Sequence, residues 1–159
     1  MRHTLSVLVE NKAGVLAKIA GLFGRRAYNI ESLAVGTTER PDISRMTIVV
    51  DANEREIEQV MKQLHKVIEV LKISNITEEE YIERELVLIK VQVDATRRTE
   101  VMQIADVFRA RIVDISPSSL IIESTGEQKK LDAIQEALRP YGIKEIVRTG
   151  ELAMVRGLK

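Results

Sequence analysis

The stretch "VLVENKAGVLAKIAGLFGRRAYNIESLAV", from Val7 to Val35, decides the fold of the first half of the chain. It opens with an apolar run, rich in Val and Leu, that predicts a strand ending at Glu10. A polar loop follows, and apolar residues then recur at helical spacing through Gly14–Tyr28. A β-branched run begins at Ile30. The stretch therefore predicts a strand, a helix that opens on a glycine, and a second strand.

The same order of elements occurs twice along the 159 residues. In the first half, periodicity predicts strands and helices in the order Met1–Glu10, Gly14–Tyr28 (helix), Ile30–Thr38, Ile43–Asp51, Glu54–Ile68 (helix) and Glu69–Ile76. A charge-rich joint, Thr77–Glu85, separates it from the second half. There the order is Leu86–Val93, Thr99–Phe108 (helix), Arg111–Ser116, Leu120–Ser124, Gln128–Leu138 (helix) and Ile143–Arg148. No element is predicted for the tail, Thr149–Lys159.

This pattern predicts an α+β protein of two tandem ferredoxin-like βαββαβ units, with antiparallel sheets that carry their helices on one face. The expected domains are residues 1–77 and 83–159. Each unit leaves one sheet face bare and has edge strands that can pair with another chain. A homodimer is therefore expected.

The composition excludes several classes of function. Lys and Arg number 24 and balance 24 Asp and Glu, and Trp is absent, so no basic surface or stacking platform indicates nucleic acid. The absence of cysteine excludes disulfides, thiolate metal sites and a cysteine nucleophile. No apolar run approaches the length of a membrane span or a signal sequence. We expect a soluble, cytoplasmic protein with no nucleic-acid or membrane partner.

No set of residues in the sequence points to catalysis. His3 and His65 have no partners at ligand or triad spacing, and we expect both at the surface or an interface. The acidic run Glu78–Glu80 is typical of a solvated linker rather than a metal site. Arg25-Arg26 suits the negative end of a helix, or an anion or partner contact. The sequence predicts no catalytic residue and no metal or cofactor site in this chain.

The loop from Asn11 to Leu16 is the strongest candidate for a binding site. The first N–H groups of a helix lack internal partners and carry partial positive charge, which suits an anion. Gly14 has no Cβ, so a ligand can approach the backbone closely. Asn11 and Asn29 carry amides that both donate and accept hydrogen bonds. A turn glycine with an Asn helix cap is the alternative interpretation of the loop.

Several stretches carry a resemblance to a known family: "LSVLVENKAGVLAKIAGLFGRRAYNIESLAV", "ISRMTIVV" and "KQLHKVIEVLKI" in the first half, and "ERELVLIKV" and "FRARIVDISPSSLIIESTG" in the second. They resemble the small, regulatory subunit of acetohydroxyacid synthase (acetolactate synthase). The first unit resembles an ACT domain, an amino-acid-binding module.

The resemblance implies a non-catalytic subunit that activates a separate catalytic large subunit, in which thiamine diphosphate, Mg²⁺ and FAD are expected. The large subunit condenses pyruvate with pyruvate or 2-oxobutyrate, toward valine, leucine and isoleucine. The small subunit confers feedback inhibition by valine, which sits between the ACT domains of two copies. The second unit is a candidate for dimerisation and for contact with the large subunit.

Carried over by position, the resemblance implies a valine site. Its residues are Asn11, Ala13, Gly14, Val15 and Leu16 from one copy, and Asn29 and Ile30 from the other. The N–H groups near Gly14–Leu16 would hold the valine carboxylate. Asn11 and Asn29 would accept from its ammonium, and Val15 and Ile30 would line its side chain.

Two residues depart from the family pattern. Ala27 stands where the family usually has glycine after the first helix, and a left-handed alanine there costs on the order of 1 kcal/mol. Lys18 replaces a commoner arginine and loses a bidentate donor. A stand-alone amino-acid sensor that acts on another enzyme or on a transcription factor is the alternative function.

Overall fold

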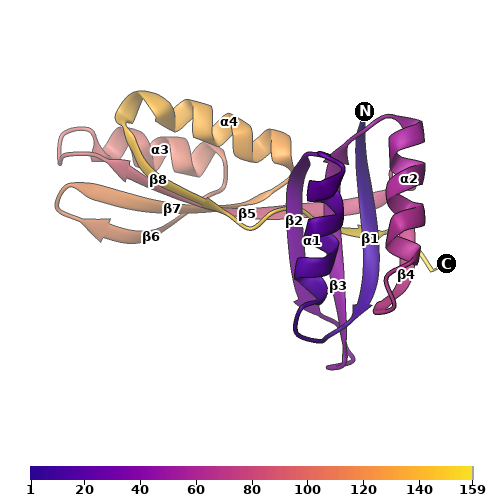
Figure 1. Ribbon diagram of the computed structural model, residues 1–159. Coiled ribbons are helices and arrows are strands. Elements are labelled where there is room, and N and C mark those ends of the chain that lie inside the picture. Colours follow the sequence, from indigo (N-terminus) through magenta and orange to yellow (C-terminus); the bar gives the residue numbers. More distant parts are fainter. Residues whose placement is uncertain (159) are drawn as a thin grey trace. The chain divides into compact units, whose positions relative to one another are not determined.

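The computed structural model describes residues 1–158, which form two compact units (Figure 1). The first unit comprises residues 1–82 and 151–158, and the second comprises residues 83–150. Each unit contains one antiparallel sheet with two helices on one face, which confirms the two tandem βαββαβ units.

The first unit contains a four-stranded sheet in the order β2-β3-β1-β4. Its elements are β1 (Arg2–Glu10), α1 (Val15–Arg25), β2 (Ile30–Thr37), β3 (Ile43–Asp51), α2 (Glu54–His65) and β4 (Val70–Asn75). Strands β2 and β4 are its edges. The central strand β1 pairs with both β3 and β4.

Every second side chain of β1 points toward the helices, so the core lies between the sheet and its helices. Leu5, Val7 and Val9 are at most 1% exposed and pack with Ile19 and Phe23 of α1. Burying a side chain of this size contributes about 1.5–3 kcal/mol. The start of α2 is set by a capping box, in which Asn53 and Glu56 exchange hydrogen bonds, so the chain enters this helix at one defined residue.

Helix α1 ends in a left-handed residue that is not glycine. Ala27 has φ 56°, its N–H donates to the Gly24 carbonyl, and the N–H of Tyr28 donates to Phe23 at 3.2 Å. This pair of bonds is a Schellman motif. The sequence left open whether α1 ends differently at Ala27 or whether a strained, left-handed alanine is tolerated. In the structure Ala27 is left-handed, so the strain is tolerated.

The second unit repeats the arrangement with strand order β6-β7-β5-β8. Its elements are β5 (Tyr81–Gln92), α3 (Arg98–Val107), β6 (Arg111–Ser116), β7 (Ser119–Gly126), α4 (Gln128–Leu138), a 3₁₀ turn (Arg139–Tyr141) and β8 (Ile143–Arg148). Val87, Ile89 and Val91 of β5 fill its core. Helix α3 also ends in a Schellman motif, with Arg109 at φ 56°.

The expected joint and tail differ most from the sequence-based assignment. The segment predicted as a joint from Thr77 to Glu85 joins β5 at Tyr81, and the tail contains a further strand, β9 (Leu152–Val155), which pairs with β5. The described residues from 151 onward belong to the first unit, whereas the expected second domain ran over 83–159. The reason is a long-range backbone contact, in which the Arg156 N–H donates to the Glu80 carbonyl at 2.8 Å.

The sequence predicted a bare face for each sheet, and this prediction is wrong for the helix-free face of the first sheet. Thr4 and Ser6 on β1 are 3% and 7% exposed, and the Thr4 hydroxyl lies 3.4 Å from the hydroxyl of Tyr81. The segment after β4 and the strand β9 therefore cover part of this face. The helix-free face of the second sheet stays open, with Leu88 and Val147 at 37% and 54% exposed.

No helix within residues 1–158 is long and apolar enough to cross a membrane.

Candidate functional site at the start of α1

The loop between β1 and α1 is tied to the turn between β2 and β3. The backbone N–H of Asn11 donates to the Asp42 carbonyl at 2.8 Å, and its side-chain Nδ2 donates to the Pro41 carbonyl at 3.0 Å. The amide nitrogen of Asn11 is therefore engaged, and its Oδ1 remains to accept from a ligand. Asn11 does not cap α1, so the interpretation of this loop as an Asn helix cap is wrong.

Gly14 is the N-cap residue of α1 and has φ 87°, in the left-handed region that favours glycine. A Cβ built on Gly14 meets nothing within 4 Å, so the space over this residue is open. Without a capping side chain, the N–H groups of Leu16 and Ala17 have no acceptor within residues 1–158. These donors and the helix dipole suit a carboxylate.

The cations near the loop are already paired. Lys18 forms an ion pair with Glu69, and Lys12 lies 3.2 Å from Glu10. The hydrogen bond from Lys18, with a further backbone hydrogen bond, lowers the pKa of Glu69. Because these charges cancel locally, the attraction for an anion comes from the open N–H groups of α1 rather than from a free lysine.

The apolar residues of the loop divide between core and surface. The Val15 side chain is 3% exposed and lies in the core, so only its backbone is available to a ligand. Leu16 is 46% exposed beside Gly14, and Ala13 is also exposed. Leu16 is therefore better placed than Val15 to line an apolar ligand group.

The two halves of the predicted site lie at opposite ends of α1. Asn29 is exposed and Ile30 is half-buried at the start of β2, after the turn at Ala27. The eleven residues of α1 span about 16 Å, so Gly14 and Asn29 of one copy do not meet. A site that uses both ends of α1 requires a second copy.

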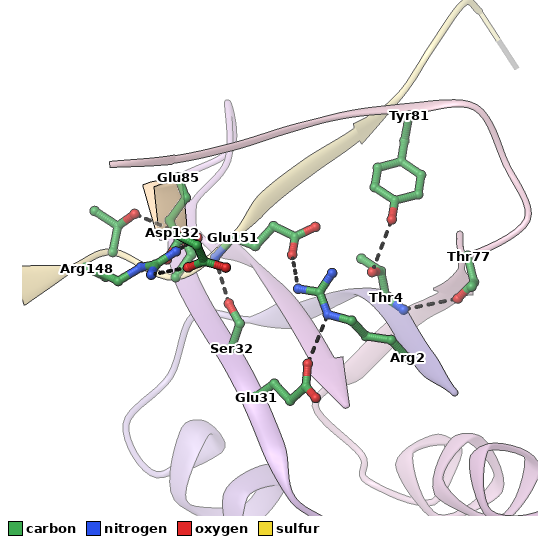
Figure 2. A network of polar contacts seen from close by, with 12 residues as sticks. Arg2, Thr4, Glu31, Ser32, Thr77, Tyr81, Glu85, Asp132, Arg148 and Glu151 are labelled. Carbon is green, nitrogen blue, oxygen red and sulfur yellow. Dashed lines mark hydrogen bonds and ion pairs between the residues drawn. The ribbon is translucent and has the colours of Figure 1, made fainter. Parts of the chain in front are cut away.

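A polar network that the sequence did not reveal fixes the start of β2. Arg2 Nε donates to Glu31 at 2.9 Å, and a terminal nitrogen of Arg2 donates to Glu151 at 2.8 Å (Figure 2). Burial opposes the charge of the guanidinium, but the hydrogen bonds to Glu31 and Glu151 outweigh it and raise the pKa of Arg2. The backbone N–H of Glu151 donates to Ser32 Oγ at 2.7 Å.

No local sequence pattern predicts this network, because Arg2 and Glu151 are 149 residues apart in sequence. The only available signal was the charge of Arg2 in an apolar, strand-like stretch, because the tail around Glu151 predicted no element.

The two histidines lie on different elements of the first unit, His3 on β1 and His65 on α2. His3 is 2% exposed, so the expectation of a surface or interface position is wrong, and its Nδ1 lies 3.5 Å from Asn75 Nδ2. His65 is exposed on α2. Within residues 1–158 no group of three His, Cys, Asp or Glu side chains is close enough together to hold a metal ion.

Both halves of the chain match families of known proteins. Residues 5–72 match the AHAS small subunit-like ACT domain, and residues 84–157 match the family described as the small subunit of acetolactate synthase. The chain is 58% identical over 159 residues to a probable acetolactate synthase small subunit of Archaeoglobus fulgidus, covering 100% of this chain and 99% of that protein.

Two further comparisons agree. The chain is 54% identical over 155 residues to the acetolactate synthase small subunit of Mycobacterium bovis, covering 98% of this chain and 92% of the relative. A crystal structure of the acetolactate synthase small subunit from Thermotoga maritima superposes with a TM-score of 0.91 at 41% identity, covering 100% of this chain and 99% of that one.

Proposed function

Because the chain belongs to the family of acetolactate synthase small subunits, we propose that it binds valine on the loop before α1 and conveys feedback inhibition to a catalytic large subunit. It also raises the activity of that subunit. A regulatory small subunit implies a catalytic partner, and the thiamine diphosphate, Mg²⁺ and FAD belong to that partner. This chain supplies an amino-acid site and no catalytic group.

The observation that carries the ligand proposal is the open start of α1. Gly14 combines a left-handed backbone with free space above it, and the N–H groups of Leu16 and Ala17 lack acceptors within residues 1–158. These groups hold the valine carboxylate. The Oδ1 of Asn11 accepts from the ammonium, and Leu16 contacts the isopropyl group.

A second copy completes the site through the edge strand β2. In a two-fold antiparallel pairing of β2 with its copy, the start of one strand lies beside the end of the other. In each copy the loop before α1 lies near the C-terminal end of β2, because Asn11 is bonded to Pro41 and Asp42 in the turn after β2. Such a dimer brings Asn29 and Ile30 of one copy next to Gly14 of the other.

The open face of the second sheet is available for a further contact. Leu88, Ile121 and Val147 line a shallow apolar depression there, with Lys90 and Glu145 forming an ion pair across it at 3.6 Å. An apolar surface rimmed by charge is typical of protein interfaces. We assign this face to dimerisation or to contact with the large subunit.

The test is reconstitution with the large subunit. The isolated chain should form no acetolactate from pyruvate. When it is added to the large subunit, the rate should rise and valine should lower it. Calorimetric titration of valine into the chain alone measures the binding site directly. Absence of binding, together with no effect on the large subunit, would refute the proposal.

A further inference from the structure

The start of β2 contains a β-bulge whose extra residue is held in place by Arg2. In the pairing of β2 with β3, Ile30 faces Val50 and Ser32 faces Val49, so Glu31 has no partner of its own. Bulges of this kind change the direction of nearby side chains. Arg2 bonds the Glu31 carboxylate at 2.9 Å and thereby fixes the bulge next to Asn29 and Ile30.

A second nitrogen of the Arg2 guanidinium donates to a buried carboxylate. The Glu151 side chain is 4% exposed and accepts from Arg2 at 2.8 Å, and its backbone N–H donates to Ser32 Oγ. Arg2 thus joins the Glu31 carboxylate at the bulge to the carboxylate of Glu151. The bulge and residue 151 are therefore fixed to each other. We call Glu31, Arg2 and Glu151 the Arg2 latch.

The latch lies where the chain re-enters the first unit. Gly150 is the last residue of the second unit. Within that unit, Arg148 donates two hydrogen bonds to the Glu85 carboxylate, at 2.8 and 3.1 Å, and one to Asp132 at 2.8 Å. Only Thr149 and Gly150 separate this anchor from Glu151. The latch is therefore joined to β8 by two residues of chain.

We propose that the Arg2 latch couples amino-acid binding at the start of β2 to the second unit, with Arg2 and Glu151 as positioning residues. The inference rests on the proposed function, because it assigns the path by which that ligand is sensed. A ligand that contacts Asn29 and Ile30 restrains the bulge at Glu31. Arg2 passes the restraint to Glu151 and so to the short connection to β8.

The experiment compares Glu151→Gln with the wild-type protein, each as the proposed dimer. Glutamine keeps the shape and removes the charge. Amide hydrogen exchange of residues 143–150, in the second unit, is measured with and without saturating valine. In the wild type, valine should slow this exchange, and in the variant the ratio of rates should shrink by about 2- to 30-fold. Asp51→Asn is the matched control, since it removes an exposed partner of the N-terminal ammonium on the strand beside Arg2 and should leave the ratio unchanged.

A merely structural role predicts a different result. It would lower the stability of Glu151→Gln and leave the valine-dependent ratio intact, which would overturn the inference. If Glu151→Gln does not fold, Arg2→Lys serves, because lysine keeps the charge but does not bridge two carboxylates as a fork. An undiminished ratio in that variant would overturn the inference as well.

Calorimetry on the wild type separates the two proposals. If valine does not bind, the proposed function fails and the coupling fails with it. If valine binds but the exchange of residues 143–150 does not respond, the coupling alone is overturned and the proposed function stands.

Discussion

Replacing Gly14 with aspartate places a negative charge where the proposed ligand carboxylate lies. The side chain has room, since a Cβ at this position meets nothing within 4 Å. Its cost to folding is the left-handed backbone at φ 87°, about 1 kcal/mol for a residue with a side chain. Asp is among the residues that tolerate this region, so Gly14→Asp should fold.

The size of the effect follows from Coulomb's law. Two unit charges about 4 Å apart repel by ~1 kcal/mol in water and by ~4 kcal/mol at an effective dielectric constant of 20. Because every 1.4 kcal/mol is about tenfold in affinity, valine should bind roughly tenfold to a thousandfold more weakly. Inhibition should weaken with it, since a ligand shifts an equilibrium only through its differential affinity for the two states.

Gly14→Asn is the matched control. Asparagine has the same shape as aspartate and the same backbone strain at φ 87°, and it carries no charge. The difference in valine affinity between the two variants therefore isolates the repulsion. Calorimetric titration gives the affinities, and valine inhibition of the reconstituted enzyme gives the functional consequence.

Equal valine affinities for folded Gly14→Asp and Gly14→Asn would show that no ligand carboxylate lies near this residue. If both variants also matched the wild type, the loop would not be the valine site at all. Activation of the large subunit should persist in both variants, because this loop is assigned to the ligand and not to the catalytic partner.

Three further outcomes are expected. Ala27→Gly and Arg109→Gly each relieve a left-handed residue at a helix end and should raise the free energy of unfolding by about 0.5–1 kcal/mol, as measured by urea denaturation; a loss of stability at both sites would contradict the strain argument. The pKa of Asp94 is lowered by hydrogen bonds from the Thr96 side chain and the Arg97 backbone, so its stabilisation is present above the unfolded pKa of about 3.9 and is lost as the pH falls through the folded value. The free energies of unfolding of Asp94→Asn and the wild type should therefore differ at pH 7 and converge as the pH falls below the unfolded pKa of about 3.9, and a constant difference across this range would exclude the charge as the cause. Val35→Lys puts like charges on the exposed edge strand β2 of both copies and should shift light scattering from dimer toward monomer, whereas an unchanged dimer would move the interface elsewhere.

The order of elements in both units was predictable because it follows from the local spacing of apolar residues. Apolar residues at every second position of β1 and at helical spacing in α4 report which face is buried, and that requires only neighbours in sequence. The helix Gln128–Leu138 and the strand Ile143–Arg148 were predicted with the bounds that the structure has. The loop at Gly14 was recognisable for the same reason, as a glycine between two periodic stretches.

Tertiary structure alone decided the role of the tail and the contacts at the start of β2. Strand β9 is a short segment that gains its hydrogen bonds from β5, far away in the chain, so its own composition predicts nothing. Arg2 and Glu151 each look like an isolated charge in sequence, and only folding brings them to 2.8 Å and buries the carboxylate. The separation of Gly14 from Asn29 by the length of α1 likewise follows from the fold, and it is the physical reason why one copy cannot assemble the proposed site.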